Sequence, residues 1–173
     1  RAVLELHNMV DQRLEEVEQQ LREAEGDDDL IESLREMRAT LRWLRRVTFA
    51  VPQHRLGDEL AERCEQVGLS AAVFRGRLAD NPDAPGETMC LKPQDVGRVV
   101  AAGLSVSQTM CRFVDGGLEL ECEHFDECPY QGQMAVIRAA DVAIVPHSSL
   151  FHQMPSIGAC GTLIIDEGFI FAG

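Results

Sequence analysis

Apolar residues recur at helical spacing through the first part of the chain. Two sets follow one another at intervals of three and four positions: Val10, Leu14, Val17 and Leu21, then Leu30, Leu34, Met37, Leu41 and Leu44. Such spacing places apolar side chains on one face of a helix. Between the two sets, Gly26 can end the first helix and an Asp can cap the second. Residues 2–46 are therefore predicted to form an antiparallel helical hairpin.

The pattern then changes to short apolar runs, which are typical of buried strands. Four runs have this character: residues 47–51, 71–74, 142–145 and 163–165. Helices are predicted between them at about 56–67, with Leu56, Leu60, Cys64 and Val67 on one face, and at 131–140, with a short helical segment at 148–154. Strand, helix and strand at this spacing favour parallel βαβ units. The chain is therefore expected to have an α/β fold.

The middle of the chain has weaker patterning. Residues 75–89 contain two Pro and two Gly and are predicted to form a loop. A short helix is predicted at 94–102, and Asp115-Gly116-Gly117 predicts the turn of a small hairpin. Because this stretch has few apolar residues for a core of its own, a bound metal could supply its stability.

Composition limits the class of protein. The chain has 173 residues, of which 45% are hydrophobic and 26% charged, and no apolar run approaches the roughly 20 residues that cross a bilayer. We expect a cytoplasmic protein with no membrane partner. The net charge of −13 argues against a simple nucleic-acid-binding module. The single lysine, Lys92, lies outside any GxxxxGK[ST] loop, so this chain alone should not bind ATP tightly. We expect it to be a fragment of a longer protein.

Four of the six cysteines, Cys90, Cys111, Cys122 and Cys128, fall within this weakly patterned stretch. Four thiolates can hold an iron–sulfur cluster or a tetrahedral zinc ion. His124 could replace one cysteine in a zinc site, although the paired CxxC motifs of zinc ribbons are absent. Unconnected cysteines are the alternative. Cys64 and Cys160 lie in apolar patterns and are expected to be core residues.

The last apolar run, Leu163–Ile165, ends in two acids, Asp166 and Glu167. In nucleotide hydrolases the first acid after such a strand holds Mg²⁺ and the second orients or deprotonates the attacking water. A buried strand would fix the backbone, and its carboxyl end would face the phosphates. The competing interpretation is an ordinary strand that ends in acids.

In their order along the chain and in their local sequences, these motifs resemble those of the iron–sulfur-cluster DNA helicases of superfamily two, the DinG and XPD type. Those proteins carry four cysteines between two helicase motifs, and the last is commonly followed by Pro-Tyr, as in Cys128-Pro129-Tyr130. Residues 140–151, ADVAIVPHSSLF, are similar to the segment that follows the last cysteine and a helix in those helicases. Residues 163–169, LIIDEGF, are similar to their DEAH box. Upstream, residues 49–60, FAVPQHRLGDEL, look like motif Ia.

The resemblance implies a partial RecA-like parallel-sheet motor domain with an inserted cysteine-rich subdomain. It implies that Cys90, Cys111, Cys122 and Cys128 bind a [4Fe–4S] cluster, that Asp166 binds Mg²⁺ of Mg-ATP, and that Glu167 activates water. Gln53, His54 and Arg55 would lie near the DNA backbone. The Walker A loop that ATP binding needs, and a second motor domain, are expected elsewhere in the protein.

The expected organisation is a helical hairpin (1–46), the first part of the motor domain (47–89), the iron–sulfur insertion (90–130) and the second part of the motor domain (131–173). The expected function is that of an ATP-dependent DNA helicase, which translocates on single-stranded DNA and unwinds forked duplexes. The fragment alone is expected to be inactive. A non-enzymatic zinc-binding interaction module is the main alternative, and a redox-sensing or cysteine-based enzyme is another.

Overall fold

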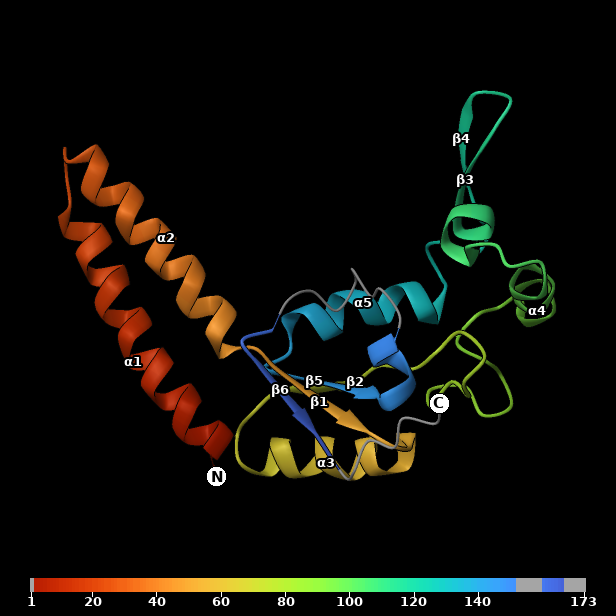
Figure 1. The fold of residues 1–173 in the computed structure, drawn as a ribbon, viewed down its shortest axis with the longest axis horizontal. Helices are drawn as coiled ribbons and strands as arrows, with labels where there is room; N and C mark the ends of the chain where they lie inside the picture. The colour runs from red at the N-terminus through yellow and green to blue at the C-terminus, as the bar shows by residue number, and fades with distance from the viewer. Residues whose placement is uncertain (1, 152–159, 167–173) are drawn as a thin grey trace. The chain divides into compact units, whose positions relative to one another are not determined.

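The computed structural model describes residues 2–151 and 160–166, and the chain divides into two compact units, Arg1–Val73 with Ile137–Gly173, and Phe74–Val136. The first unit holds the helices α1 (Ala2–Glu23), α2 (Asp28–Arg45) and α3 (His54–Gln66), the strands β1 (Val47–Val51), β2 (Ala71–Val73), β5 (Val142–Pro146) and β6 (Thr162–Ile165), and the 3-10 helix η2 (His147–Phe151). The second unit holds α4 (Pro93–Ala101), the π-helix η1 (Ser107–Cys111), β3 (Arg112–Asp115), β4 (Leu118–Glu121) and most of α5 (Pro129–Ala139) (Figure 1). None of the described helices is both long and apolar enough to cross a membrane.

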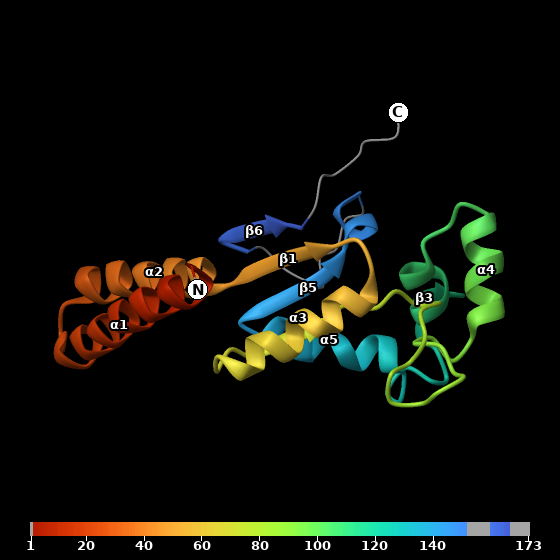
Figure 2. The same ribbon diagram turned by 90° about the horizontal axis from the view of Figure 1, so that it is seen from below.

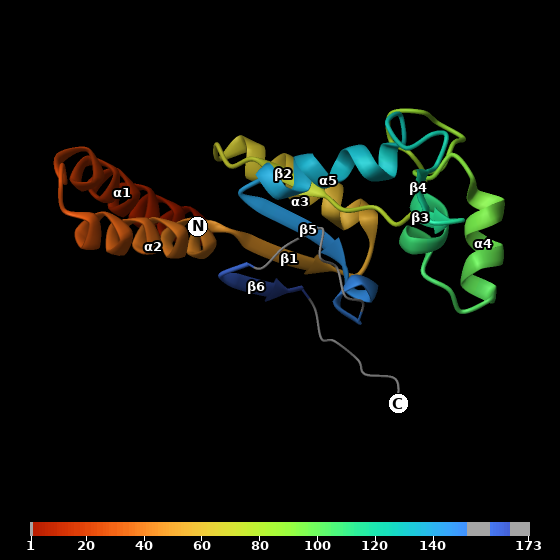
Figure 3. The ribbon, with the colours of Figure 1, turned by 90° about the horizontal axis from the view of Figure 1, so that it is seen from above.

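The predicted N-terminal helical hairpin is confirmed: α1 and α2 run side by side (Figure 3). Gly26 follows α1 with a φ of +85°, and the Asp27 carboxylate accepts a hydrogen bond from the backbone N–H of Leu30 at 3.0 Å, capping α2. Val17 and Leu34 are at the centre of the helix–helix contact.

One part of the predicted apolar face of α2 is wrong. Leu30 and Met37 are 46% and 39% exposed, whereas Ile31 and Leu41 pack against the buried Leu34. The apolar residues of α2 are spaced so that a face with Leu30 and a face with Ile31 were both possible. The contact with α1 uses the face that contains Ile31.

The predicted α/β fold is also confirmed, as a four-stranded parallel sheet in the order β2-β5-β1-β6 (Figure 3). β1 and β2 therefore belong to one parallel sheet, but β5 lies between them. Helix α3 packs on this sheet through Leu56, Leu60 and Cys64, against a core that includes Val51 and Ile144. Val67, expected on the same helix face, is 52% exposed because it lies just beyond the end of α3.

Strand β6 is less buried than its apolar sequence suggested. It pairs with β1, and no other described strand pairs with it, so it is an edge strand of the described sheet. Leu163 and Ile165 are 49% and 44% exposed. The expectation of a buried strand before the acidic pair is therefore wrong for the described residues, although its parallel pairing with β1 still fixes the direction of β6.

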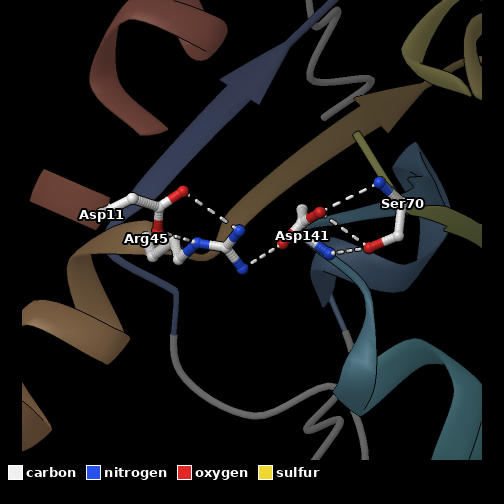
Figure 4. Close-up of polar contacts among 4 residues, drawn as sticks. All are labelled: Asp11, Arg45, Ser70 and Asp141. Carbon is white, nitrogen blue, oxygen red and sulfur yellow. Dashed lines mark hydrogen bonds and ion pairs between the residues drawn. The ribbon is translucent and has the colours of Figure 1, made fainter. Parts of the chain in front are cut away.

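A polar network joins the helical hairpin to the sheet within the first unit (Figure 4). Arg45, the last residue of α2, donates to the two carboxylate oxygens of Asp11 on α1 at 2.6 and 3.3 Å, and forms an ion pair with Asp141, which precedes β5. Asp141 in turn accepts hydrogen bonds from the backbone N–H and the hydroxyl of Ser70, at 2.9 and 2.8 Å. The hairpin is thus held to the sheet by charged contacts at the point where α2 leads into β1.

The second unit has a small core. Its buried cluster consists of Cys90, Val96 and Val106, with Val99, Met110 and Cys111 packed around it. The predicted Gly-Gly turn joins β3 and β4 in an antiparallel hairpin, with φ angles of +57° and +82° at the two glycines, as two-residue hairpin turns require.

Candidate functional site

The four cysteines of the second unit come from four separate segments that backbone contacts bring together. Cys111 ends η1 and Cys122 follows β4, and the N–H of Cys122 donates to the carbonyl of Cys111 at 3.0 Å. Cys128, just before α5, directs its Sγ at the carbonyl of Met89 at 3.7 Å, next to Cys90. Two cysteine pairs distant in sequence thus have neighbouring segments: Cys111 and Cys122 through a backbone hydrogen bond, and Cys90 and Cys128 through the contact of the Cys128 sulfur with Met89.

Cys90 links these two pairs because it packs in the same apolar cluster as Cys111. It is 8% exposed, and burial raises the pKa of its thiol. A hydrogen bond to the backbone of Lys92 lowers the pKa of this thiol, and the nearby thiols of Cys128 and Cys111 raise it further. The pKa of the Cys90 thiol is therefore raised mainly by burial and only secondarily by its two neighbouring thiols.

Arg77 is a cation of this region that the sequence alone did not single out. Its guanidinium lies over the ring of Tyr130, 4.0 Å from the ring centroid, donates to Ser107 Oγ at 2.7 Å, and reaches Cys111 Sγ at 3.9 Å. Its carbonyl accepts the N–H of Cys90 at 2.9 Å. The Arg77 cation also lowers the pKa of the Cys90 thiol, although burial outweighs it.

Tyr130 supports the Arg77 guanidinium through its ring. Its ring also packs edge-on against Phe74, with ring centroids 6.0 Å apart, and its N–H donates to the carbonyl of Met89 at 2.9 Å. Burial raises the pKa of the Tyr130 phenol, while the Arg77 cation lowers it. The Pro-Tyr that follows the last cysteine thus has a structural role: it supports the arginine that faces Cys111.

His124, the possible substitute ligand, is engaged elsewhere. Its Nδ1 lies 2.5 Å from a carboxylate oxygen of Glu127, and its Nε2 lies 3.6 Å from Glu123. Glu123 also forms an ion pair with Lys92 at 2.7 Å. These contacts place the imidazole of His124 among carboxylates.

The donor chemistry of the site fits a thiolate-ligated centre, although the side chains are not closed around one point. All four thiols are free. Among the residues that the structure describes, no three His, Cys, Asp or Glu side chains are already grouped so as to hold a metal ion. The segments that carry the thiols are nevertheless linked to one another by hydrogen bonds and by packing in one apolar cluster.

The acidic motif lies at a different place, the carboxyl edge of the parallel sheet. All four strands point the same way, so β1, β5 and β6 end at one edge (Figure 2). Asp166 follows β6, and its N–H donates to the carbonyl of Ala50 in β1 at 2.9 Å. Glu167 lies outside the described residues. Ligands of open α/β sheets bind at this edge.

The residues expected near DNA follow β1 at the same edge. Gln53 precedes α3, and His54 and Arg55 form its first turn. The Arg55 side chain is 85% exposed and has an ion pair with Glu59 at 3.5 Å, one turn further along the helix. The structure therefore brings Asp166 and Gln53 to the same edge of one sheet, while the four cysteines belong to the other unit.

Comparisons with known protein families, with curated proteins and with solved structures found no match to this chain.

Proposed function

We propose that this chain is part of an ATP-dependent DNA helicase that carries a [4Fe–4S] cluster. The observation that carries the proposal is the convergence of four cysteine-bearing segments in a unit inserted, in sequence, between strands β2 and β5 of a parallel sheet. That arrangement supports a metal-bound insertion in a RecA-like motor domain, with Cys90, Cys111, Cys122 and Cys128 as ligands. The cluster would stabilise the insertion, whose own apolar core is small.

In this proposal the sheet edge is the site of nucleotide chemistry. Asp166 would bind Mg²⁺ of Mg-ATP, held in position by the hydrogen bond from its N–H to β1. Glu167 would orient or deprotonate the attacking water. Phosphate binding in such a helicase requires a Walker A loop, which the 173 residues do not contain, so the proposal assigns the ATPase activity to a protein that includes that loop and a second motor domain in addition to these residues.

DNA would contact the segment after β1. Gln53, His54 and Arg55 follow that strand directly, and the exposed Arg55 side chain can reach a phosphate. ATP hydrolysis at the same edge of the sheet would then be coupled to translocation along single-stranded DNA. Forked DNA would be the substrate that is unwound.

The test is metal analysis of protein purified without oxygen. We expect an absorption band near ~400 nm and about four irons per chain, lost in Cys111→Ser and in Cys128→Ser. Cys64→Ser is the matched control, because Cys64 packs against the sheet and not in the cysteine-rich unit. One zinc and no iron in the wild type would favour the alternative, a zinc-binding interaction module. No bound metal in anaerobically purified wild type would contradict both.

The helicase part of the proposal needs a separate test in the full-length protein. We expect DNA-stimulated ATP hydrolysis that is abolished by Asp166→Asn and by Glu167→Gln, with iron content unchanged. Equal ATP hydrolysis in wild type and both variants would contradict the roles given to these acids, whatever the metal analysis shows.

A further inference from the structure

The β3–β4 hairpin is a two-stranded ribbon with an open edge. In the described part of the chain no third strand pairs with it. Every residue of β4 is exposed. In an antiparallel pair, alternate residues direct their N–H and C=O groups away from the partner strand. The outer edge of β4 therefore offers unpaired backbone donors and acceptors, which is the feature that strand addition uses.

The two faces of this ribbon differ in chemistry. The register pairs Phe113 with Leu120 and Asp115 with Leu118, so Leu118 and Leu120 lie on one face, where they are 68% and 39% exposed. Glu119 and Glu121 project from the other face. An open pocket of about 810 Å³ borders the ribbon and is lined by Phe113, Leu120 and Glu121, among others. Isolated hairpins with exposed apolar side chains are marginal in water, and a third strand would bury those side chains.

The surroundings of the hairpin are acidic. Between residues 112 and 127 the only Lys or Arg is Arg112, against six acids: Asp115, Glu119, Glu121, Glu123, Asp126 and Glu127. Arg112 is already engaged with Glu121 at 2.8 Å and with the ring of Phe125. Lys92 forms an ion pair with Glu123, but acids still outnumber basic residues in and directly after the hairpin, and Glu119 projects from it.

We propose that the outer edge of β4 binds an extended segment of a partner protein as a third strand, one in which basic and apolar residues alternate. Side chains of neighbouring strands lie opposite each other on the same face. Apolar residues of the added strand would pack on Leu118 and Leu120. Its lysines or arginines would face Glu119 and Glu121 on the other side. The hairpin lies between Cys111 and Cys122 in sequence, and the proposed binding edge uses neither cysteine.

Charge argues against two other occupants. A second copy of this hairpin, paired edge to edge, would bring Glu119 and Glu121 close to the same residues of its partner, and like charges across strands destabilise pairing. Nucleic acid would place phosphates beside the same carboxylates, where neutralisation by Lys or Arg is what binding needs. A basic peptide is the occupant whose charge complements this edge.

The test uses the whole 173-residue chain and a fluorescein-labelled peptide, KVRIKVRI, followed by fluorescence anisotropy at about 0.15 M salt. The comparison peptide, KRKRVIVI, has the same composition with the residues in blocks. A second comparison peptide carries N-methyl groups at alternate positions, which removes the N–H groups that would pair with β4. A single-stranded oligothymidylate is the nucleic-acid probe.

We expect the alternating peptide to bind more tightly than both comparison peptides. Glu119→Lys/Glu121→Lys should weaken its binding by about tenfold or more. Glu62→Lys/Glu65→Lys, which makes the same charge change on α3, should leave its binding unchanged. Glu119→Lys alone keeps the Arg112–Glu121 ion pair, so an intermediate loss in this variant, with an unchanged circular dichroism spectrum, would show that the effect comes neither from breaking that pair nor from unfolding.

Several results would overturn the proposal. One is binding of the alternating peptide weaker than about 1 mM. Another is equal binding of the block or N-methylated peptide, since the alternation and the backbone pairing would then be irrelevant. A third is peptide affinity that is unaffected by the changes at Glu119 and Glu121. Binding of the oligothymidylate that weakens when these two residues become lysine would instead identify the hairpin as a nucleic-acid surface.

Discussion

The ion pair between Arg45 and Asp141 should decide how firmly the helical hairpin is held to the sheet. The Asp141 side chain is only 10% exposed and accepts two hydrogen bonds from Ser70. The Arg45 side chain is 35% exposed, and it would keep its contact with Asp11 if Asp141 were changed. Hydrogen bonds to a charged group are worth roughly 1.5–3 kcal/mol. Solvent reduces the contribution of the Arg45 guanidinium, because about a third of that side chain is exposed. We therefore expect Asp141→Asn to lower the free energy of unfolding by about 2 kcal/mol.

Urea unfolding followed by tryptophan fluorescence is the assay. The single tryptophan, Trp43, lies near the end of α2 in the same unit as Asp141 and so reports on that unit. With a slope of about 2 kcal/mol per molar urea, a loss of 2 kcal/mol lowers the midpoint by about 1 M. Glu62→Gln, an exposed change on α3, is the control and should leave the midpoint within about 0.2 M of the wild-type value.

The same pair gives a pH dependence. Burial raises the pKa of the Asp141 carboxyl, but the hydrogen bonds from Ser70 and the Arg45 cation outweigh burial and leave its pKa below the ordinary value. The stabilisation is therefore complete above the unfolded-state pKa of about 3.9 and is lost as pH falls through the lower folded-state pKa. The difference between wild type and Asp141→Asn should shrink below about pH 4. Equal midpoints at pH 7, or a difference that persists unchanged at pH 2, would refute this account.

Two further substitutions test contacts that the structure makes explicit. Gly161→Ala should lower the free energy of unfolding of the first unit by roughly 1–3 kcal/mol, because the new Cβ would lie 2.6 Å from the backbone Cα of Leu44. A melting temperature equal to that of the wild type would contradict this. Arg77→Gln should lower the reduction potential of the proposed cluster by about 60 mV, since reduction adds negative charge near Cys111 and the nearby cation would be gone. Arg77→Lys should restore the potential only partly because lysine cannot stack flat on Tyr130, and an unchanged potential in both variants would exclude this role.

Local features of the fold could be predicted because short-range rules determine them. Asp27 is a favoured residue for capping a helix, and the Gly116-Gly117 turn needs backbone conformations that few other residues adopt. The continuous apolar run Val142–Val145 predicts a strand that is buried on both faces, as β5 is. The strand order could not be predicted. Nothing local to Val47–Val51 indicates that β5, which is distant in sequence, lies between it and β2.

For the candidate cysteine site, too, the residue types could be predicted from the sequence but the contacts between them could not. The four cysteines are evident in the sequence by residue type, but Arg77 lies in a loop without periodicity, 34 positions before the Cys111 sulfur that it reaches. Only the fold brings Arg77 between Tyr130 and Ser107. Likewise, Arg45 and Asp141 look like ordinary surface charges until the parallel sheet brings the end of α2 next to the start of β5. Contacts of this kind depend on long-range topology, which periodicity does not encode.

The small core of the second unit has a consequence for any metal that binds there. Two of the residues that form or surround that core, Cys90 and Cys111, are also the proposed ligands, so the same side chains provide apolar packing and metal binding. In the metal-free state Cys90 can act as a small buried hydrophobe, and the raised pKa of its thiol favours that neutral form. Metal binding would replace this weak packing with bonds between all four segments. Folding of the second unit should therefore be coupled to metal binding, whereas the sheet unit has its own core around Val51 and Ile144 and should not depend on the metal.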